Sequence, residues 1–509
     1  MPRTFRPRLT VVAALLLFLP PLEAAEKSSA YQAALSSISA SELGNEVGEL
    51  ADVALEGREA GTAGGHAAGE HLAEQYKRLR FAGAGPEGGY FQPFAPNFRN
   101  VLAVLPGSDP KLRDQVIVVG AHYDHLGYGG RSSLGPYGYV HPGADDNASG
   151  TSAVLEIAQA FSLLPSPPKR TVLFAHWDAE EKGLLGSKYW VANPTLPREH
   201  VAAMINLDMI GRLRENRLNV YGVGSGAGWR RLVSLANEEG LHLAFRYDVS
   251  NRADHHPFYA TGIPVVMFHT GMHDQYHRPS DAAQLINKEG LEKVARLVFA
   301  VAYELADGTA SPAFRTATPV DPESPLTGKP VDRLGVGWND DAATAGGVRV
   351  TLVKHDTPAE RAGVQTGDLI VRFAGRDIRC DADFFATVSS AESPATVTVV
   401  RSESPKPVDL KVELVGDPLR WGFTWRVDEA ETGAIILTHV VPGSPADQAG
   451  LAIGDRVYRV AGRDFADETE FARLVKTSAE SLQLLVERDG RVRHVPLRAR
   501  LSETIRRAA

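Results

Sequence analysis

The apolar residues between positions 26 and 308 gather into short runs rich in β-branched side chains, separated by longer stretches typical of helices. The clearest short runs lie at residues 116–120, 171–175, 201–205 and 264–268. Continuous apolar runs of this length are typical of strands buried on both faces of a parallel sheet. The clearest helical stretches lie at residues 149–161 and 288–305. We therefore predict an α/β domain over residues 26–308, with a mostly parallel central sheet flanked by helices.

The pattern changes after residue 308. A Pro-, Thr- and Ser-rich stretch at residues 309–330 is typical of a linker. Beyond it the chain repeats itself, because the segment Thr-Pro-Ala-Glu-Arg-Ala-Gly ending at Gly363 has the counterpart Ser-Pro-Ala-Asp-Gln-Ala-Gly ending at Gly450. A Gly-Asp pair follows each copy. A repeat of this length predicts two small, mainly-β domains in tandem, at residues 331–415 and 417–499, rather than a solenoid.

The N-terminus has the order of an export signal. Three arginines precede an apolar run at residues 9–19, and the small residues Ala24 and Ala25 follow it. This order predicts a signal peptide over residues 1–25. The run is shorter than the roughly 20 residues needed to cross a bilayer. We therefore expect an exported protein, periplasmic or secreted, with no stable membrane span.

The charge and the cysteine content argue against nucleic acid binding and against stabilisation by disulfides. The net charge of −8, with no basic stripe, gives no reason to expect nucleic acid binding. Cys380 is the single cysteine, so no intramolecular disulfide can form. It lies far from the chemical motifs described next and is not a candidate nucleophile. The hydrophobic cores and any bound metal must therefore stabilise the chain.

Five metal-binding side chains follow the predicted strands of the α/β domain. They are His122, Asp146, Glu181, Asp208 and His277. In open α/β sheets, ligand sites form at the carboxyl ends of the strands, which is where these residues fall. Two histidines and three carboxylates suit two neighbouring zinc ions when one carboxylate bridges them. Glu180 stands beside a candidate ligand, where a general base would lie.

The residues around these ligands have predicted supporting roles. Asp124 lies two residues after His122, so the two side chains point the same way on an extended segment. We expect its carboxylate to accept the ring N–H of His122. Other histidines flank the motifs, but the ligand set is complete without them, so we interpret them as non-ligands: His125, His141, His256, His269 and His273.

The motifs resemble those of dinuclear zinc aminopeptidases and glutamate carboxypeptidase-type metallopeptidases over residues 43–305. They comprise His-Tyr-Asp at 122–124, Gly-Ala-Asp-Asp-Asn-Ala-Ser-Gly at 143–150, Glu-Glu at 180–181, Asn-Leu-Asp at 206–208 and Tyr-His at 276–277. The resemblance implies two zinc ions bridged by Asp146, with Asp145 beside it left free. His122 and Asp208 would serve one ion, and Glu181 and His277 the other. Tyr276 would stabilise the oxyanion, and Asp254-His255 would support the site or contact substrate.

The two tandem units resemble PDZ domains. The repeated segment and an upstream Gly loop carry this resemblance, with the loops at residues 334–336 and 421–423. In that family the loop offers backbone N–H groups to a peptide C-terminal carboxylate, and the peptide adds as a strand to a sheet edge. The resemblance implies peptide C-termini as partners. The alternative is that both units are spacers or covers that bind no free peptide.

Together with the predicted export signal, the resemblance implies an exported zinc aminopeptidase that hydrolyses N-terminal residues from peptides. A glutaminyl cyclase of the same fold is an alternative, but such enzymes typically use one zinc ion and the full ligand set argues against it. A carboxypeptidase would need a basic pocket to bind the terminal carboxylate of its substrate. The only candidates for such a pocket are Arg212, Arg214 and Arg252. A peptide-binding adaptor with a degenerate peptidase domain is the non-enzyme alternative, and the intact Glu180 speaks against it. Many members of that family carry a large insert before the first metal histidine, whereas here only residues 98–116 lead into the strand that ends at His122. We therefore expect a less covered site, unless the PDZ-like units cover it.

Overall fold

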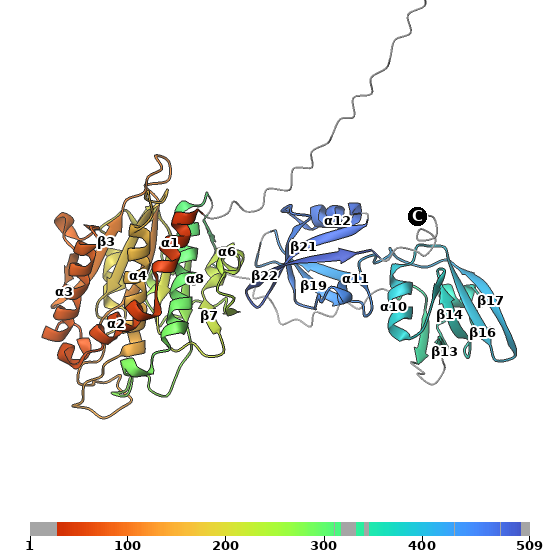
Figure 1. Ribbon diagram of the computed structural model, residues 1–509, viewed down its shortest axis with the longest axis horizontal. Helices are drawn as coiled ribbons and strands as arrows, with labels where there is room; N and C mark the ends of the chain where they lie inside the picture. The colour runs from red at the N-terminus through yellow and green to blue at the C-terminus, as the bar shows by residue number, and fades with distance from the viewer. Residues whose placement is uncertain are drawn as a thin grey trace, which may run out of the picture.

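A computed structural model describes residues 28–309, 311–316, 332–339, 346–431, 433–478 and 480–499. The predicted signal peptide and most of the predicted linker lie outside the described residues. Three units follow one another along the long axis of the molecule (Figure 1). We call them the N-terminal domain, the first small domain (residues 332–415) and the second small domain (residues 417–499). Within the described residues, no helix is long and apolar enough to cross a membrane.

The N-terminal domain is built on one nine-stranded sheet with the order β1-β3-β5-β4-β6-β10-β7-β9, and β2 pairs with β3 beside this path. Its strands are β1 (Ala82–Gly83), β2 (Phe91–Phe94), β3 (Phe98–Leu105), β4 (Val116–His122), β5 (Thr171–Trp177), β6 (Val201–Leu207), β7 (Arg217–Tyr221), β9 (His242–Phe245) and β10 (Val265–His269). The central strands β5, β4, β6 and β10 are parallel neighbours. All four predicted strands are present and begin within one residue of the predicted position, which confirms the mostly parallel sheet.

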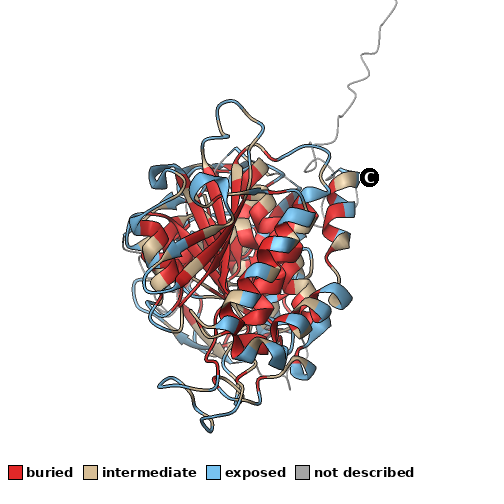
Figure 2. Ribbon diagram, turned by 90° about the vertical axis from the view of Figure 1, so that its left-hand side faces the viewer, coloured by how far each residue is buried: buried red, intermediate tan, exposed pale blue. Residues whose placement is uncertain are grey.

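Helices cover both faces of this sheet. They are α1 (Ser29–Ser37), α2 (Ala40–Leu50), α3 (Ala63–Arg78), α4 (Gly150–Ser162), α5 (Leu185–Ala192), α6 (Trp229–Ala236), α7 (His255–Tyr259) and α8 (Lys288–Asp307). Along β4, Ile117 and Val119 pack in the core that contains α4 and α8, whereas Val118 packs in the core that contains Trp190 and Phe258 of the opposite face. Figure 2 shows the sheet buried between its helices. Burial on both faces explains why the strands are continuous apolar runs.

The two small domains are antiparallel sheets with short helices. The first contains β12 (Val336–Asn339), β13 (Val348–Val353), α9 (Pro358–Arg361), β14 (Leu369–Phe373), β15 (Arg376–Asp377), α10 (Asp381–Ser390), β16 (Ala395–Arg401) and β17 (Ser404–Val412). The second contains β18 (Phe423–Val427), β19 (Ile435–Val440), α11 (Pro445–Gln448), β20 (Arg456–Val460), α12 (Glu468–Thr477), β21 (Ser481–Arg488) and β22 (Arg491–Arg498). In the N-terminal domain, β8 (Gly226–Ala227), which precedes α6, pairs with β11 (Ala313–Phe314), which follows α8.

The repeated Gly-Asp pair has the same structural role in both small domains. Asp368 is buried and accepts a hydrogen bond from the backbone N–H of Gln365 at 2.9 Å. Asp455 is buried and accepts one from the N–H of Ala452 at 2.9 Å. Each carboxylate closes the turn that leads into the next strand. The repeat therefore reflects one fold used twice.

Candidate metal centre

The five predicted ligands meet at one edge of the central sheet. His122 ends β4, Asp208 follows β6, Glu181 follows β5, and His277 lies in the loop after β10. Asp146 lies in the irregular turn Ala144–Ser149 that precedes α4. Since the parallel strands β4, β5, β6 and β10 end at the same edge, residues separated by more than 150 positions come together there.

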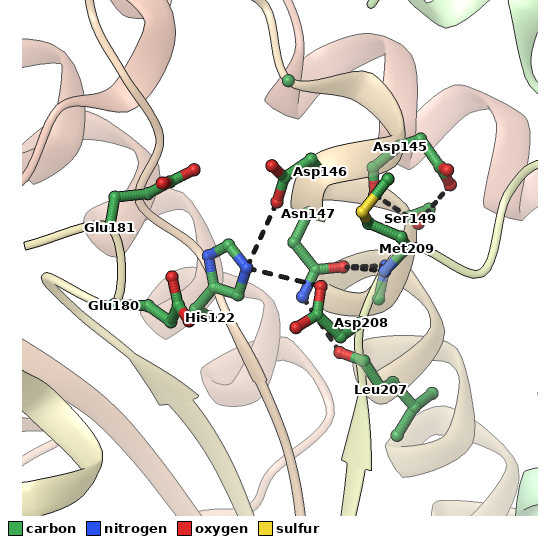
Figure 3. A network of polar contacts seen from close by, with 12 residues as sticks. His122, Asp145, Asp146, Asn147, Ser149, Glu180, Glu181, Leu207, Asp208 and Met209 are labelled. Atoms are coloured by element: carbon green, nitrogen blue, oxygen red, sulfur yellow. Dashed lines mark hydrogen bonds and ion pairs between the residues drawn. The ribbon is translucent and has the colours of Figure 1, made fainter. Parts of the chain in front are cut away.

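The carboxylate of Asp146 lies between two histidines. Its Oδ1 atom is 3.3 Å from His122 Nε2, and its Oδ2 atom is 3.0 Å from His277 Nε2. His122 Nε2 also lies 3.7 Å from Asp208 Oδ1 (Figure 3). His277 Nε2 lies 3.3 Å from Glu181 Oε2. The two oxygens of one carboxylate thus face two separate ligand groups, which is the arrangement of a bridging ligand.

Several polar atoms of this cluster have no hydrogen-bond partner and are of the kind that binds cations. Asp146 Oδ2, Glu181 Oε1 and both ring nitrogens of His125 are buried and have no hydrogen-bond partner of acceptable geometry among the described residues. Buried polar atoms without partners are costly unless something else satisfies them. Histidine nitrogens and carboxylate oxygens within reach of one another are zinc donors. Two sets of donors are compact enough to hold an ion: His122, Asp146 and Asp208; and His125, Asp146 and Glu181.

His125 is the residue that sequence reasoning set aside and the structure brings into the cluster. Its Nδ1 atom is 2.9 Å from Glu181 Oε1 and 3.9 Å from Asp146 Oδ2. Its ring meets that of His277 edge to face, with centroids 5.8 Å apart. The available signal was its position three residues after His122 in the same loop. His277 and His125 therefore both reach Glu181, and the second group has three nitrogen and carboxylate side chains in addition to Asp146.

Protons and metal ions compete for this cluster. Burial lowers the pKa of His277, but the close carboxylates of Asp146 and Glu181 outweigh this effect and raise the pKa to about 10. In the absence of a cation, a protonated imidazole therefore balances the carboxylates. A metal that binds the neutral ring must displace that proton, so metal affinity falls as the pH falls.

Asp124 contacts the site differently from the predicted way. His122 Nδ1 lies 3.2 Å from the backbone carbonyl oxygen of Asp124 and 3.7 Å from its carboxylate. The carboxylate Oδ1 instead accepts the backbone N–H of Glu180 at 3.0 Å. One residue thus fixes two parts of the site, with its main chain toward a ligand and its side chain toward the candidate base.

Glu180 and Tyr276 line a cavity beside the five candidate ligands. Glu180 is half-buried beside His122 (Figure 3). Burial raises its pKa well above the usual range of a carboxyl group, and the charge of His122 opposes that rise. The ring of Tyr276 stacks on that of His277, with centroids 3.8 Å apart. Burial, together with the charges of Asp146 and Glu181, raises the pKa of Tyr276, so its hydroxyl stays a hydrogen-bond donor.

The turn that carries Asp146 is held from several sides. Asp281 Oδ2 accepts the backbone N–H groups of Asp145 at 2.9 Å and Asp146 at 3.1 Å. The side chain of Asp145 points away from the cluster, where its carboxylate accepts the N–H of Gly211 at 2.6 Å (Figure 3). The Asn147 side chain accepts the N–H of Met209 at 3.2 Å. These hydrogen bonds hold the side chains of the three consecutive residues Asp145, Asp146 and Asn147 in three different directions.

Arg58 binds the loop after β4 and the turn before α4. Its buried guanidinium donates to the carbonyl oxygens of Leu50, Tyr123, Pro142 and Gly143. Burial lowers its pKa to about 10, so the group stays charged at neutral pH. It therefore joins the loop after β4 to the turn before α4 and places a positive charge behind the acidic centre.

The predicted supporting residues and the histidines interpreted as non-ligands lie around this centre. Asp254 is buried and accepts the Ser187 hydroxyl at 2.5 Å, which fits a supporting role. His255 is buried beside it. Two of the histidines interpreted as non-ligands have other partners. His273 lies 3.1 Å from the carboxylate of Asp145, which points away from the cluster, and His141 lies 2.7 Å from the Ser133 hydroxyl.

A cavity of about 370 Å³ opens above the centre. It is lined by the candidate ligands His122, Asp146, Glu181, Asp208 and His277, by Glu180 and Tyr276, and by Met209, Tyr221, Asp248, Ser250, Arg252, Ala253, Met267, His269, Gly271 and Met272. All of these residues belong to the N-terminal domain. The predicted metal centre therefore forms the floor of a pocket with mixed apolar and polar walls.

Comparison with known proteins defines the class of this fold and site. Residues 100–302 match the model of peptidase family M28, and residues 331–412 and 436–488 match two PDZ domain models. The aminopeptidase YwaD of Bacillus subtilis is 31% identical over 219 residues, covering 40% of this chain and 44% of that protein. Leupeptin-inactivating enzyme 1 of Streptomyces exfoliatus is 28% identical over 305 residues, covering 55% of this chain and 63% of that protein. A solved zinc aminopeptidase from Bacillus subtilis superposes with a TM-score of 0.44 at 18% identity, covering 55% of this chain and 98% of that one.

The N-terminal domain thus matches the metallopeptidases of family M28 over residues 100–302. The two small domains match PDZ domain models, and we call them the first and second PDZ domains. The chain spans less than two thirds of the length of the two relatives named.

Proposed function

We propose that the protein is an exported aminopeptidase that holds two zinc ions and removes N-terminal residues from peptides. The observation that carries the proposal is the Asp146 carboxylate, whose two oxygens lie 3.3 and 3.0 Å from His122 and His277. His122 and Asp208 would hold one ion, and Glu181 and His277 the other, with His125 within reach of the second. When bound, zinc supplies Lewis acidity toward water and the scissile carbonyl.

The protein side chains then carry out the proton transfers. Glu180 takes a proton from the attacking water and delivers it to the leaving amine. Burial raises its pKa, and a carboxyl group with a raised pKa accepts a proton more readily than an ordinary one. The Tyr276 hydroxyl donates to the developing oxyanion. The carboxylates around the cavity favour a substrate that brings a positive charge, which a free α-amino group does.

The test is hydrolysis of aminoacyl-nitroanilides with free amino groups beside N-blocked copies, with zinc and after chelation. Chelator-sensitive release from the free-amino substrates alone supports an aminopeptidase. Glu180→Gln should abolish that release while zinc content, measured by elemental analysis, stays at the wild-type value. Release from N-blocked substrates with a free C-terminus would instead favour a carboxypeptidase, for which Arg252 in the cavity wall is the candidate cation.

The PDZ domains are proposed to bind peptide C-termini. The strands that follow the Gly loops, β12 and β18, each lie at the edge of their sheet and can accept an added strand. Fluorescence anisotropy with labelled peptides that have free or amidated C-termini tests this. Equal binding of both forms would contradict recognition of the carboxylate.

Export is proposed from residues 1–25 alone. The measurement is the N-terminal sequence of the mature protein from the medium or the periplasm. A new N-terminus near Ala24 or Ala25 is expected, and an intact Met1 in a cytoplasmic fraction would contradict it.

A further inference from the structure

Among the described residues, the hydrogen bonds and ion pairs that join a PDZ domain to the N-terminal catalytic domain come from the second PDZ domain. Figure 1 shows it between the other two units, although the first PDZ domain precedes it in the chain. The contact is made at the start of α6. Backbone N–H groups of Gly228 and Arg230 donate to the two carboxylate oxygens of Glu431 at 2.9 and 3.0 Å. Glu431 is 1% exposed, so a side chain of one domain caps a helix of the other away from solvent.

A buried ion pair lies beside this cap. Arg230 Nε is 3.1 Å from Glu487 Oε2, and Arg230 Nη2 is 3.2 Å from Glu487 Oε1. Glu487, from β21 of the second PDZ domain, is fully buried. Removing one partner of such a pair leaves an uncompensated buried charge, so substitution of either residue should loosen the contact between the domains. A movable delivery module would make a more exposed and weaker contact.

The main chain continues the contact along the edge of the catalytic sheet. β9 is the last strand of that sheet. The N–H of Leu243 in β9 donates to the carbonyl oxygen of Asp489, in the turn between β21 and β22, at 2.9 Å. Asn237 donates to the carbonyl oxygen of Gly490 at 2.8 Å. The turn of the second PDZ domain therefore satisfies an edge that would otherwise be exposed.

β9 leads directly into the wall of the substrate cavity. Asp248, Ser250 and Arg252, which follow it, line the cavity. The Arg230 guanidinium lies over the ring of Phe245, the last residue of β9, at 4.5 Å from its centroid. Its Nη1 atom is 3.4 Å from the Tyr247 hydroxyl. The same side chain that binds the second PDZ domain thus contacts the segment that forms the wall.

We propose that the second PDZ domain is a fixed part of the catalytic unit and positions residues 246–253, so that Arg230 is a positioning residue for substrate fit. None of the described PDZ residues lines the cavity, so the domain acts through β9 rather than as a lid. The effect on catalysis rests on the proposed aminopeptidase function, whereas the effect on the wall does not.

The first test is hydrogen exchange on the full-length, metal-loaded protein. Arg230→Ala is compared with Arg231→Ala, which removes a partly exposed ion pair to Asp464 in the same interface without touching the wall. Exchange in residues 242–253 should rise several-fold in Arg230→Ala and stay at the wild-type rate in Arg231→Ala. Should Arg230→Ala fail to fold, Glu487→Gln weakens the same pair from the PDZ side with its shape kept.

The second test is steady-state kinetics with a short aminoacyl-nitroanilide, which is too small to reach either PDZ domain. Arg230→Ala should raise KM several-fold, with a smaller change in kcat and unchanged metal content. Faster exchange in the interface with an unchanged wall and unchanged KM would overturn the proposal. If the wild-type protein hydrolyses none of the substrates, the proposed function fails, and the exchange experiment still decides whether the second PDZ domain holds the wall.

Discussion

The carboxylate of Asp124 accepts the backbone N–H of Glu180 at 3.0 Å. Asp124 is fully buried and follows β4, whereas Glu180 follows β5. The bond therefore joins the loops of two neighbouring parallel strands and fixes the main chain of the candidate base. The Oδ2 atom of Asp124 has no hydrogen-bond partner among the described residues, so the bond to Glu180 is the hydrogen bond that this carboxylate makes there.

Asp124→Ala should lower kcat by about 10- to 100-fold, the range typical of residues that support a metal site. The reason is that Glu180 loses the bond that orients its loop. Asp124→Asn keeps an acceptor oxygen and should lose much less activity. Both variants are assayed with their zinc content measured. Equal and full activity of both would show that the Asp124–Glu180 bond does not orient the base.

Replacing His277 or His125 should weaken one of the two metal sites. His277 lies 3.3 Å and His125 2.9 Å from Glu181. We expect His277→Ala to reduce bound zinc from two ions to about one, and His125→Ala to lower the affinity for the second ion by about 10- to 100-fold. Titration calorimetry with zinc on the apo-protein measures both. His256→Ala, on α7 outside the two donor groups, is the matched control. Unchanged affinity in His125→Ala would remove that residue from the centre.

Glu156 should make stability depend on pH. It lies in α4, nearly buried, with one carboxylate oxygen without a partner among the described residues. Burial and the nearby Glu42 and Glu46 raise its pKa from 4.5 to about 8. Because the pKa is higher in the folded state, the protonated form stabilises the protein below about pH 4.5, and this contribution is lost as the pH rises through 8.

The uncharged variant Glu156→Gln should lack this loss. At pH 8.5 and above it should be more stable than the wild type by an amount on the order of a few kcal/mol, since one pKa unit corresponds to about 1.4 kcal/mol. Near pH 5 the difference should be small. Urea unfolding across this range checks the prediction. The exposed Glu74→Gln, on α3, serves as the control. A constant difference between wild type and Glu156→Gln would contradict the raised pKa.

The Gly loop of the first PDZ domain has an internal occupant. The N–H of Gly335 donates to the carboxylate of Asp332 at 2.7 Å, and Lys354 pairs with the other oxygen of that carboxylate at 2.5 Å. A peptide carboxylate must displace Asp332 to reach this N–H. Asp332→Ala should therefore bind a peptide with a free C-terminus more tightly, and the same peptide with an amidated end equally weakly. Weaker binding in the variant would mean that Asp332 shapes the loop for the ligand rather than competing with it.

Much of this protein could be predicted from the sequence because its signals are local. The strands of the parallel sheet are buried on both faces, so each is a continuous apolar run that is visible without alignment. His122, Glu181 and Asp208 directly end or follow three of those runs, and parallel strands bring their ends to one edge. The repeated Gly-Asp pair marked the two small domains because each Asp closes the same turn in its own unit.

Other features depend on distances in space that no local pattern encodes. Three features follow from how the loops pack after the sheet has formed. They are the approach of His125 to Glu181, the four carbonyl contacts of Arg58, and the contact of His122 with the backbone rather than the carboxylate of Asp124. Arg230 and Glu487 are 257 residues apart, and each lies in a segment that is unremarkable in sequence. The sequence by itself determined the sheet, the ligand types and the order of the domains, because burial and motif spacing act along the chain. Only the tertiary structure decided which histidines share the second group and which PDZ domain contacts the catalytic domain, because those contacts join parts of the chain whose residues carry no signal of one another.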